Sequence, residues 1–322
     1  MTSVPKEIYE DHRYVNIGDL PTGFGPYQES GIDTIFVRPF TVRELNLLYV
    51  GANTEGNGLE HILRAVNMCL SCDVNILTDG DLEYVMAWLR QYSFPKTPSL
   101  VTWYCRKVNF VYSTNKAFYE HDQPDENTIV NLGLEREQCN KENNEIVHNA
   151  KMMVDTLDDD DLTMAYSDLD FPRVGTLTDY HTLLYEYPED WYEAKVARWV
   201  REGNTLDEKI QALRKNNDPN QYKRILECMK RYHHGIHEKM KLRCRGCGNT
   251  MDRTLSPNIT TFFASNSEQS ILDMQYTLLS EFGLQPDDDM PSKTLLYHHS
   301  CLMRDKKDEE EKRKLQEAVR KT

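Results

Sequence analysis

The stretch Cys244-Arg245-Gly246-Cys247-Gly248 places two cysteines two residues apart and follows them at once with a glycine. Two thiolates at this spacing can bind one metal ion, and the glycines relieve crowding of the backbone in the turn. Short runs typical of β-strands flank the turn on both sides. The pattern predicts a knuckle that supplies two of the four ligands of a structural zinc ion.

Two other interpretations of this pair stay open: a redox dithiol and two unliganded, reduced thiols. A redox pair is typical of the position directly after a strand in a βαβ unit, and no such pattern precedes Cys244. Metal binding therefore needs two further ligands elsewhere in the chain.

Cys105 and Cys139 are the leading candidates for those ligands. Cys105 ends a predicted strand, and Cys139 opens a turn, so each lies at a strand–turn junction. The 33 residues between them (106–138) are rich in Tyr, Asp, Asn and Glu, like an insertion within a metal-binding turn. Without the insertion the two cysteines would form half of a zinc ribbon. We therefore expect one structural zinc ion per chain, bound by Cys105, Cys139, Cys244 and Cys247.

Other cysteines and histidines are rival ligands. Cys69 and Cys72 also have the Cys-x-x-Cys spacing, but their apolar neighbours favour buried core thiols. Cys228 is expected in the core of its own helix. Replacement of a cysteine ligand by a histidine stays open, and the further candidates are His233, His234, His237, His298, His299 and Cys301. A helix that ends before Gly235 accounts for His233 and His234 without a metal, because the helix C-terminus favours a protonated imidazole.

Length and charge limit the function classes. A chain of 322 residues can form a sizeable core and two domains. Its net charge of -14 argues against binding a nucleic-acid backbone. No apolar stretch is long enough to cross a bilayer, and residues 1–6 lack a signal-peptide core, so we expect a cytosolic chain with reduced cysteines.

The periodicity predicts an α+β protein that is mainly helical. A small antiparallel β-sheet module is inserted between the helices, and a zinc-ribbon-like Cys-x-x-Cys knuckle follows. The expected segments are an extended N-terminal arm (1–30), a strand and helical hairpin (31–98), the inserted β module (99–172), a C-terminal helical region with the knuckle (173–290) and a charged C-terminal helix (291–322).

Local signals support particular elements. Thr41 and Glu44 stand at the spacing of a capping box, and apolar residues in 59–70 and 82–94 predict two helices packed as a hairpin. β-like stretches cover Asn127–Glu135 and Asn144–Val154. Further helices are expected at about 205–216, 219–233 and 267–282.

Signatures of catalysis are missing from the sequence. It has no Gly-x-Ser-x-Gly elbow, no Walker-type phosphate loop, no Gly-x-Gly-x-x-Gly after a strand and no His-Glu-x-x-His. We therefore expect a protein that is not an enzyme and has no small-molecule substrate.

Several short patterns, in order along the chain, resemble one protein family. They are Ile35–Glu44, Leu77–Asp81 continuing to Trp88–Ser93, Phe171–Val174, His234–Ile236, Cys244–Gly248 and Thr261–Phe263. Together they resemble the baseplate hub and hub-assembly proteins of T-even-type contractile-tailed bacteriophages (myoviruses). The likeness spans roughly 31–187 and 225–265. The chain departs from the family at the first cysteine pair, which the insertion divides.

This resemblance implies a structural or assembly component of a contractile tail baseplate, at or near the hub. Its partners would be other baseplate, hub and tail proteins, with no membrane and no nucleic acid. It would lie in the virion tail after assembly in the host bacterial cytoplasm. Two alternatives remain: a metal-dependent hydrolase with a Cys/His zinc site, and a zinc-ribbon nucleic-acid-binding regulator that uses Arg243 and Arg245.

Overall fold

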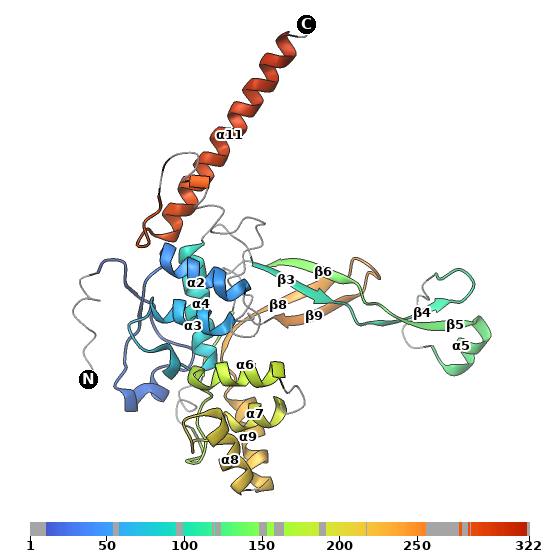
Figure 1. Cartoon of the computed structure of the whole chain (residues 1–322). Helices are drawn as coiled ribbons and strands as arrows, with labels where there is room; N and C mark the ends of the chain where they lie inside the picture. Colours follow the sequence, from blue (N-terminus) through green and yellow to red (C-terminus); the bar gives the residue numbers. More distant parts are fainter. Residues whose placement is uncertain are drawn as a thin grey trace. The chain divides into compact units, whose positions relative to one another are not determined.

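The protein is described here from a computed structural model. The structure describes residues 11–53, 58–94, 99–117, 119, 124–147, 153–157, 164–186, 191–216, 218–255, 277–278, 283 and 285–320. Helices and small antiparallel sheets make up the fold, so the expected α+β class is confirmed (Figure 1). Among the described residues, none of the helices combines the length and the apolar character that crossing a membrane requires.

The chain divides into two compact units. The helical unit contains Met1–Thr97, Met153–His237 and Pro257–Thr322. The cysteine unit contains Pro98–Met152 and Glu238–Ser256, so it combines the inserted module with the knuckle hairpin.

The helical unit begins with α2 (Val42–Asn53), whose start is the predicted capping box. The backbone N–H of Thr41 donates to the Glu44 carboxylate at 2.7 Å, and Arg38 forms a buried ion pair with that carboxylate at 2.9 Å. These contacts satisfy donors at the helix start that would otherwise lack a partner.

Helix α3 (Gly58–Asn67) packs along α2 rather than against α4 (Asp79–Ser93). The prediction that 59–70 forms a hairpin with 82–94 is therefore wrong, because the helix that pairs with α3 is α2. The two helices approach so closely that a Cβ placed on Gly51 would lie 2.7 Å from the carbonyl oxygen of Gly58. Only glycines permit this approach of backbone to backbone.

Four further helices form the second half of the helical unit: α6 (Leu177–Glu186), α7 (Trp191–Ala197), α8 (Leu206–Asn216) and α9 (Pro219–Arg231). Their shared core contains Phe171, Trp199 and Cys228, so Cys228 is the core residue expected from the sequence. The guanidinium of Arg198 connects this group to α4, because it donates to both carboxylate oxygens of Asp79 at 2.6 and 2.7 Å.

The N-terminal segment from residue 11 lies against α4, where Thr22 donates to Asp81 and Tyr84 donates to the Ile17 carbonyl. Tyr27, in the 3-10 helix η1 (Gly25–Ser30), is fully buried. The buried carboxylate of Asp81 accepts hydrogen bonds from the Thr22 backbone, from the Thr22 and Tyr27 hydroxyls, and from Thr78. Residues 1–10 lie outside the described residues.

The predicted charged C-terminal helix is α11 (Ser292–Arg320). Leu295 and Leu302 are buried, whereas the run 304–314 is almost entirely exposed. Most of the helix expected at 267–282, and the Thr261–Phe263 pattern, lie outside the described residues.

The cysteine unit consists of three hairpin ladders. Strand β3 (Ser99–Tyr104) pairs with β6 (Glu142–Val147), and β4 (Val108–Tyr112) pairs with β5 (Leu134–Gln138). From Glu238 on, strand β8 (Gly235–Arg243) pairs with β9 (Thr250–Leu255). The first residues of β8 belong to the helical unit and pair there with β7 (Met153–Asp155).

A short helix, α5 (Glu126–Leu132), occupies most of the stretch Asn127–Glu135, so the strand predicted there is wrong. The Asp125 carboxylate accepts from the backbone N–H of Thr128 at 2.7 Å and caps the helix start. Gly133, with φ 59°, ends the helix in the left-handed conformation. These end signals outweigh the β propensity of Ile129 and Val130.

Candidate metal centre

The insertion is a continuation of the hairpin that carries the first cysteine pair. Tyr104 is opposite Glu142, and Val108 is opposite Gln138, so three residues on each strand separate the two ladders. Backbone hydrogen bonds cross this gap from Cys105 to Lys141 (3.0 Å) and from Cys139 to Lys107 (2.9 Å). The register is therefore unbroken from β3–β6 into β4–β5.

This register brings the first two cysteines together. Cys139 lies opposite Lys107, and Lys107 is two residues from Cys105. Residues two apart on a strand, and residues directly opposite each other, point to the same face of a ladder. Cys105 and Cys139 consequently share a face, although 33 residues separate them in the sequence.

The second pair lies in the turn between β8 and β9. The backbone N–H of Cys244 donates to Asn249 at 2.8 Å, and that of Gly248 donates back to Cys244 at 2.9 Å. Gly248 has φ 70°, in the left-handed region that glycine adopts without strain. The turn therefore curls so that both cysteines project from the same end of the hairpin.

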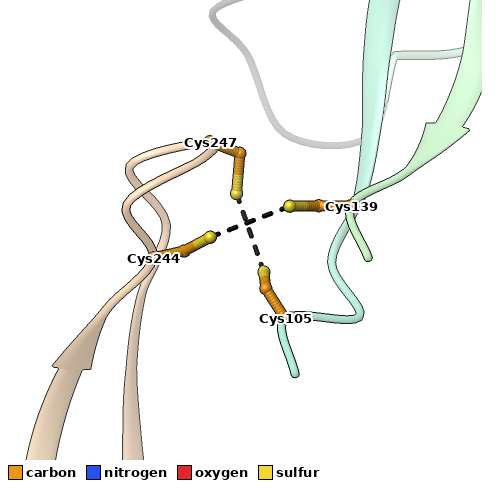
Figure 2. Close-up of side chains that lie close together, drawn as sticks. All are labelled: Cys105, Cys139, Cys244 and Cys247. Carbon is orange, nitrogen blue, oxygen red and sulfur yellow. Dashed lines mark hydrogen bonds between the residues drawn. The ribbon is translucent and has the colours of Figure 1, made fainter. Parts of the chain in front are cut away.

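The four predicted ligands meet in one cluster (Figure 2). The sulfur atoms of Cys105 and Cys247 lie 3.7 Å apart, as do those of Cys139 and Cys244. All four sulfurs lie within 4.8 Å of one another, an arrangement that could hold a metal ion. Since a disulfide requires about 2.05 Å, these are free cysteines.

Asn143 ties the two halves of the cluster together, and it is a residue that the sequence analysis missed. Its buried side chain accepts a hydrogen bond from the backbone N–H of Arg245 at 2.8 Å and donates to the Lys141 carbonyl at 2.9 Å. Its amide nitrogen also lies 3.7 Å from the Cys244 sulfur. An asparagine in a strand can serve many purposes, so the sequence alone does not reveal the role of Asn143. The role is recognised from its hydrogen bonds in the structure.

Gly246 allows the two turns to approach. A Cβ at this position would lie 3.0 Å from the Lys141 Cβ and 3.6 Å from the Cys139 sulfur. A larger residue would push the second turn away from the first. The small residue between the two knuckle cysteines is therefore required by packing across the cluster.

Cys105, Cys139 and Cys244 differ in acidity. Burial raises the pKa of Cys105 to about 12, and burial also raises the pKa of Cys139. Burial acts in the same direction on Cys244, but the backbone N–H groups of Cys247 and Gly246 and the Asn143 amide favour its thiolate and lower its pKa to about 6. Because the thiolate is the form that binds metal, Cys244 is the thiol best prepared for a cation.

Basic residues flank the clustered cysteines in the sequence. Arg106, Lys141, Arg243 and Arg245 are exposed, and each lies within two residues of a clustered cysteine.

The rival ligands lie elsewhere. Cys69 is fully buried, and burial raises the pKa of Cys72 to about 12. The imidazole of His234 contacts the Thr78 hydroxyl at 2.9 Å, and that of His237 lies 2.9 Å from Asp155. Within the part of the chain that the structure describes, the four-cysteine cluster is the only group of this kind, and it includes no histidine.

Comparisons with known proteins agree with the order of patterns seen in the sequence. A family model described as T4 bacteriophage base plate protein matches residues 27–264. The match covers well over half of the chain and includes all four clustered cysteines. Comparisons with the curated proteins and with the solved structures gave no significant match.

Proposed function

The chain belongs to the T4 bacteriophage base plate protein family, and from this membership we propose that it is a structural or assembly component at or near the baseplate hub of a contractile tail. It binds neighbouring baseplate, hub and tail proteins, and a structural zinc ion holds its cysteine unit together. The family match over residues 27–264 is the observation that carries the proposal. Such a protein is made in the host cytoplasm and becomes part of the tail.

Exposed aromatic residues support a role in binding other proteins. Trp191 is 41% exposed, Tyr192 is 43% exposed and Tyr297 on α11 is 66% exposed. Tryptophan and tyrosine are enriched among the residues that contribute most to binding at protein interfaces. These side chains give the helical unit several points at which a tail protein can dock.

The sulfur geometry supports zinc as the bound ion. A zinc–sulfur bond is about 2.3 Å long, so tetrahedral coordination places two sulfurs about 3.8 Å apart. The two sulfur–sulfur distances of 3.7 Å agree with this value. Cys105, Cys139, Cys244 and Cys247 would hold the ion, which would connect the insertion-bearing hairpin to the β8–β9 hairpin.

The ligand set supports a role without catalysis. A hydrolytic zinc keeps one coordination position open for water, whereas four cysteines fill a tetrahedral shell. The candidate histidines His234 and His237 have other partners, Thr78 and Asp155. The ion therefore contributes stability to the fold and takes part in no reaction.

Elemental analysis of the purified protein tests the zinc. We expect one zinc ion per chain in wild type, and loss of zinc in Cys105→Ser, Cys139→Ser and Cys244→Ser. Cys301→Ser, on α11, is the matched control and should keep its zinc. Zinc retained in the first three variants would contradict the proposed ligands.

Proteomic analysis of purified phage particles and of assembly intermediates tests the baseplate role. We expect the protein in tails or in hub intermediates, and we expect deletion of its gene to block baseplate formation. Normal tails assembled without the protein would refute the proposal.

A further inference from the structure

Helix α9 is basic in an acidic chain. It contains four basic residues, Lys223, Arg224, Lys230 and Arg231, and one acidic residue, Glu227, which gives a net charge of 4 − 1 = 3 positive. The whole chain has a net charge of -14. The charge of α9 therefore has the opposite sign to that of the protein that carries it.

The carboxylates around α9 already have partners. Asp168 accepts a hydrogen bond from Arg224 at 2.7 Å, and the Glu227 carboxylate lies 3.5 Å from a tyrosine hydroxyl. On α7, beside α9, both carboxylate oxygens of Glu193 accept from Arg214, at 2.8 and 2.6 Å. These carboxylates are therefore occupied within the chain itself.

Two lysines on α9 are left without such a partner. Lys223 and Lys230 are exposed, and within the part of the chain that the structure describes neither ammonium group forms an ion pair. They are seven residues apart, which is two turns of helix. Their Cα atoms thus lie on one side of α9, about 10 Å apart at 1.5 Å per residue.

An apolar side chain lies between the two lysines. Leu226 is three residues after Lys223 and four residues before Lys230, so the three side chains form one stripe along the helix. Leu226 is 38% exposed. The buried residues of α9 lie on the opposite side of the helix: Gln221, Ile225 and Cys228.

Aromatic side chains continue this surface onto α7. Tyr222 lies one turn before Leu226 on α9 and packs partly against the core. Burial raises the pKa of Tyr222, and Glu193 and Tyr192 on α7 raise it further, so these groups are close neighbours. The rings of Trp191 and Tyr192 meet edge to face, with centroids 5.6 Å apart.

Together these side chains form one surface on neighbouring helices (Figure 1). We name it the α7–α9 face, and it consists of Trp191, Tyr192, Tyr222, Lys223, Leu226 and Lys230. An aromatic and aliphatic centre with charge at its rim is the composition of a protein interface. Because the rim charges are positive and the nearby carboxylates are occupied, a complementary partner has to supply carboxylates.

Nucleic acid fits this face less well, although its phosphates are also negative. Its backbone would lie against Leu226, which offers it no hydrogen bond or charge. The net charge of -14 would also repel a polyanion along the rest of the chain. A folded acidic surface can match both the apolar centre and the lysines.

We propose that the α7–α9 face binds an acidic surface of a neighbouring tail protein. One apolar side chain of the partner packs on Leu226, and carboxylates about 10 Å apart pair with Lys223 and Lys230. The inference rests on the proposed function, because it takes its partner from the tail. It adds where on the chain that partner binds and which charge the partner carries.

Zero-length carbodiimide cross-linking of purified tails and hub intermediates tests the contact, with mass spectrometry to identify the joined peptides. The reagent links an ammonium group directly to a carboxylate that touches it. We expect Lys223 and Lys230 to be joined to Asp or Glu residues of one other tail protein.

Charge reversal tests whether the contact holds the protein in the tail. Wild type and variant are supplied together during assembly, and the ratio of their peptides in purified tails is measured. Lys223→Glu with Lys230→Glu should lower the share of the variant tenfold or more, and Leu226→Asp should lower it as well. Lysines in place of the cross-linked carboxylates of the partner should restore the doubly reversed variant.

The matched control makes the same change of charge elsewhere. Lys293→Glu with Lys312→Glu, at exposed positions on α11, should enter tails like wild type. Circular dichroism checks that each variant folds. A loss of incorporation in the control equal to that of the α9 variant would overturn the proposal, because the effect would then come from net charge alone.

The outcomes separate this inference from the proposed function. Tails that contain the protein but show no cross-link from Lys223 or Lys230 would overturn the inference alone. A chain that is absent from tails and from intermediates would refute both. Cross-links only to a second copy of the chain would assign the face to self-association. Binding of single-stranded DNA that Lys223→Glu with Lys230→Glu abolishes would assign it to nucleic acid, and either result overturns the proposal.

Discussion

The side-chain oxygen of Asn143 accepts a hydrogen bond of 2.8 Å from the backbone N–H of Arg245. This bond joins strand β6 to the turn that contains Cys244 and Cys247. It connects segments that are 102 residues apart in the chain, and the same side chain lies 3.7 Å from the Cys244 sulfur. The positions of the four cysteines thus depend on a residue that binds no metal itself.

Asn143→Ala should weaken metal binding without removing any ligand. The substitution removes the partner of the Arg245 N–H, a partly buried hydrogen bond whose loss costs about 1 kcal/mol, and it frees the second turn to move. Loss of such a supporting contact typically lowers metal affinity 10–100-fold. Competition with a chromogenic zinc chelator measures the change. Asn140→Ala, at an exposed position of the same hairpin, is the control and should bind zinc like wild type.

Removal of the metal should loosen the cysteine unit and leave the helical unit folded. Binding of a structural zinc contributes on the order of 10 kcal/mol to the folding of the segments that it joins. Hydrogen exchange should therefore accelerate in β3, β6, β8 and β9 after chelation or in Cys244→Ser. Protection in α2, α3 and α4 should persist. Equal loss of protection in both units would contradict a local role for the cluster.

Asp81→Asn should destabilise the helical unit. The buried carboxylate accepts hydrogen bonds from Thr22, Tyr27 and Thr78. The side-chain amide of an asparagine would place an N–H group where one of these hydrogen bonds now ends, so that bond would be lost. We expect a loss of about 2–4 kcal/mol in the free energy of unfolding, since hydrogen bonds to a charged group contribute more than neutral ones. Chemical denaturation measures it. Asp179→Asn on α6 is the control. A similar loss of stability in that variant would show that the effect of Asp81→Asn does not come from its buried hydrogen bonds.

The buried carboxyl of Glu83 should make the free energy of unfolding fall as the pH rises. Burial raises the pKa of its carboxyl from 4.5 to about 8. Between these values the folded chain keeps a proton that the unfolded chain has lost. The folded state is therefore favoured most below pH 4.5, and this contribution is lost towards pH 8, at up to about 1.4 kcal/mol per pH unit.

The comparison of wild type with Glu83→Gln over pH 5 to 8 isolates this contribution. The variant should lose that part of the slope and be more stable than wild type at pH 8. Glu60→Gln, at an exposed position on α3, should keep the wild-type slope. Parallel slopes for wild type and Glu83→Gln would show that Glu83 has an ordinary pKa.

Local patterns in the sequence predicted much of the fold. Thr41 and Glu44 form the expected capping box, because both partners lie within one turn of chain. The cysteine positions at strand ends were also sufficient to predict which four sulfurs meet. That the four cysteines come together follows from their places at strand ends, which the sequence shows, whereas their role as metal ligands stays a prediction.

Other features depend on contacts that a sequence does not contain. The choice of α2 as the partner of α3 follows from the approach of Gly51 to Gly58, seven residues apart across a change of direction. Asn143 is recognisable only once β6 lies beside the knuckle turn. Helix α5 differs from these cases, because its start and stop signals, Asp125 and Gly133, are present in the sequence. The β-branched residues between them led to the prediction of a strand instead.

The unbroken register on either side of Cys105 and Cys139 makes the reach of the insertion adjustable. Adding two residues to β4 and two to β5 would move α5 about 7 Å farther from the cluster and leave every side chain on its present face. A change of one residue in one strand would instead turn the rest of that strand over. The span between the cysteine cluster and α5 can therefore vary in fixed steps of about 7 Å, while the cluster and the faces of both strands stay as they are.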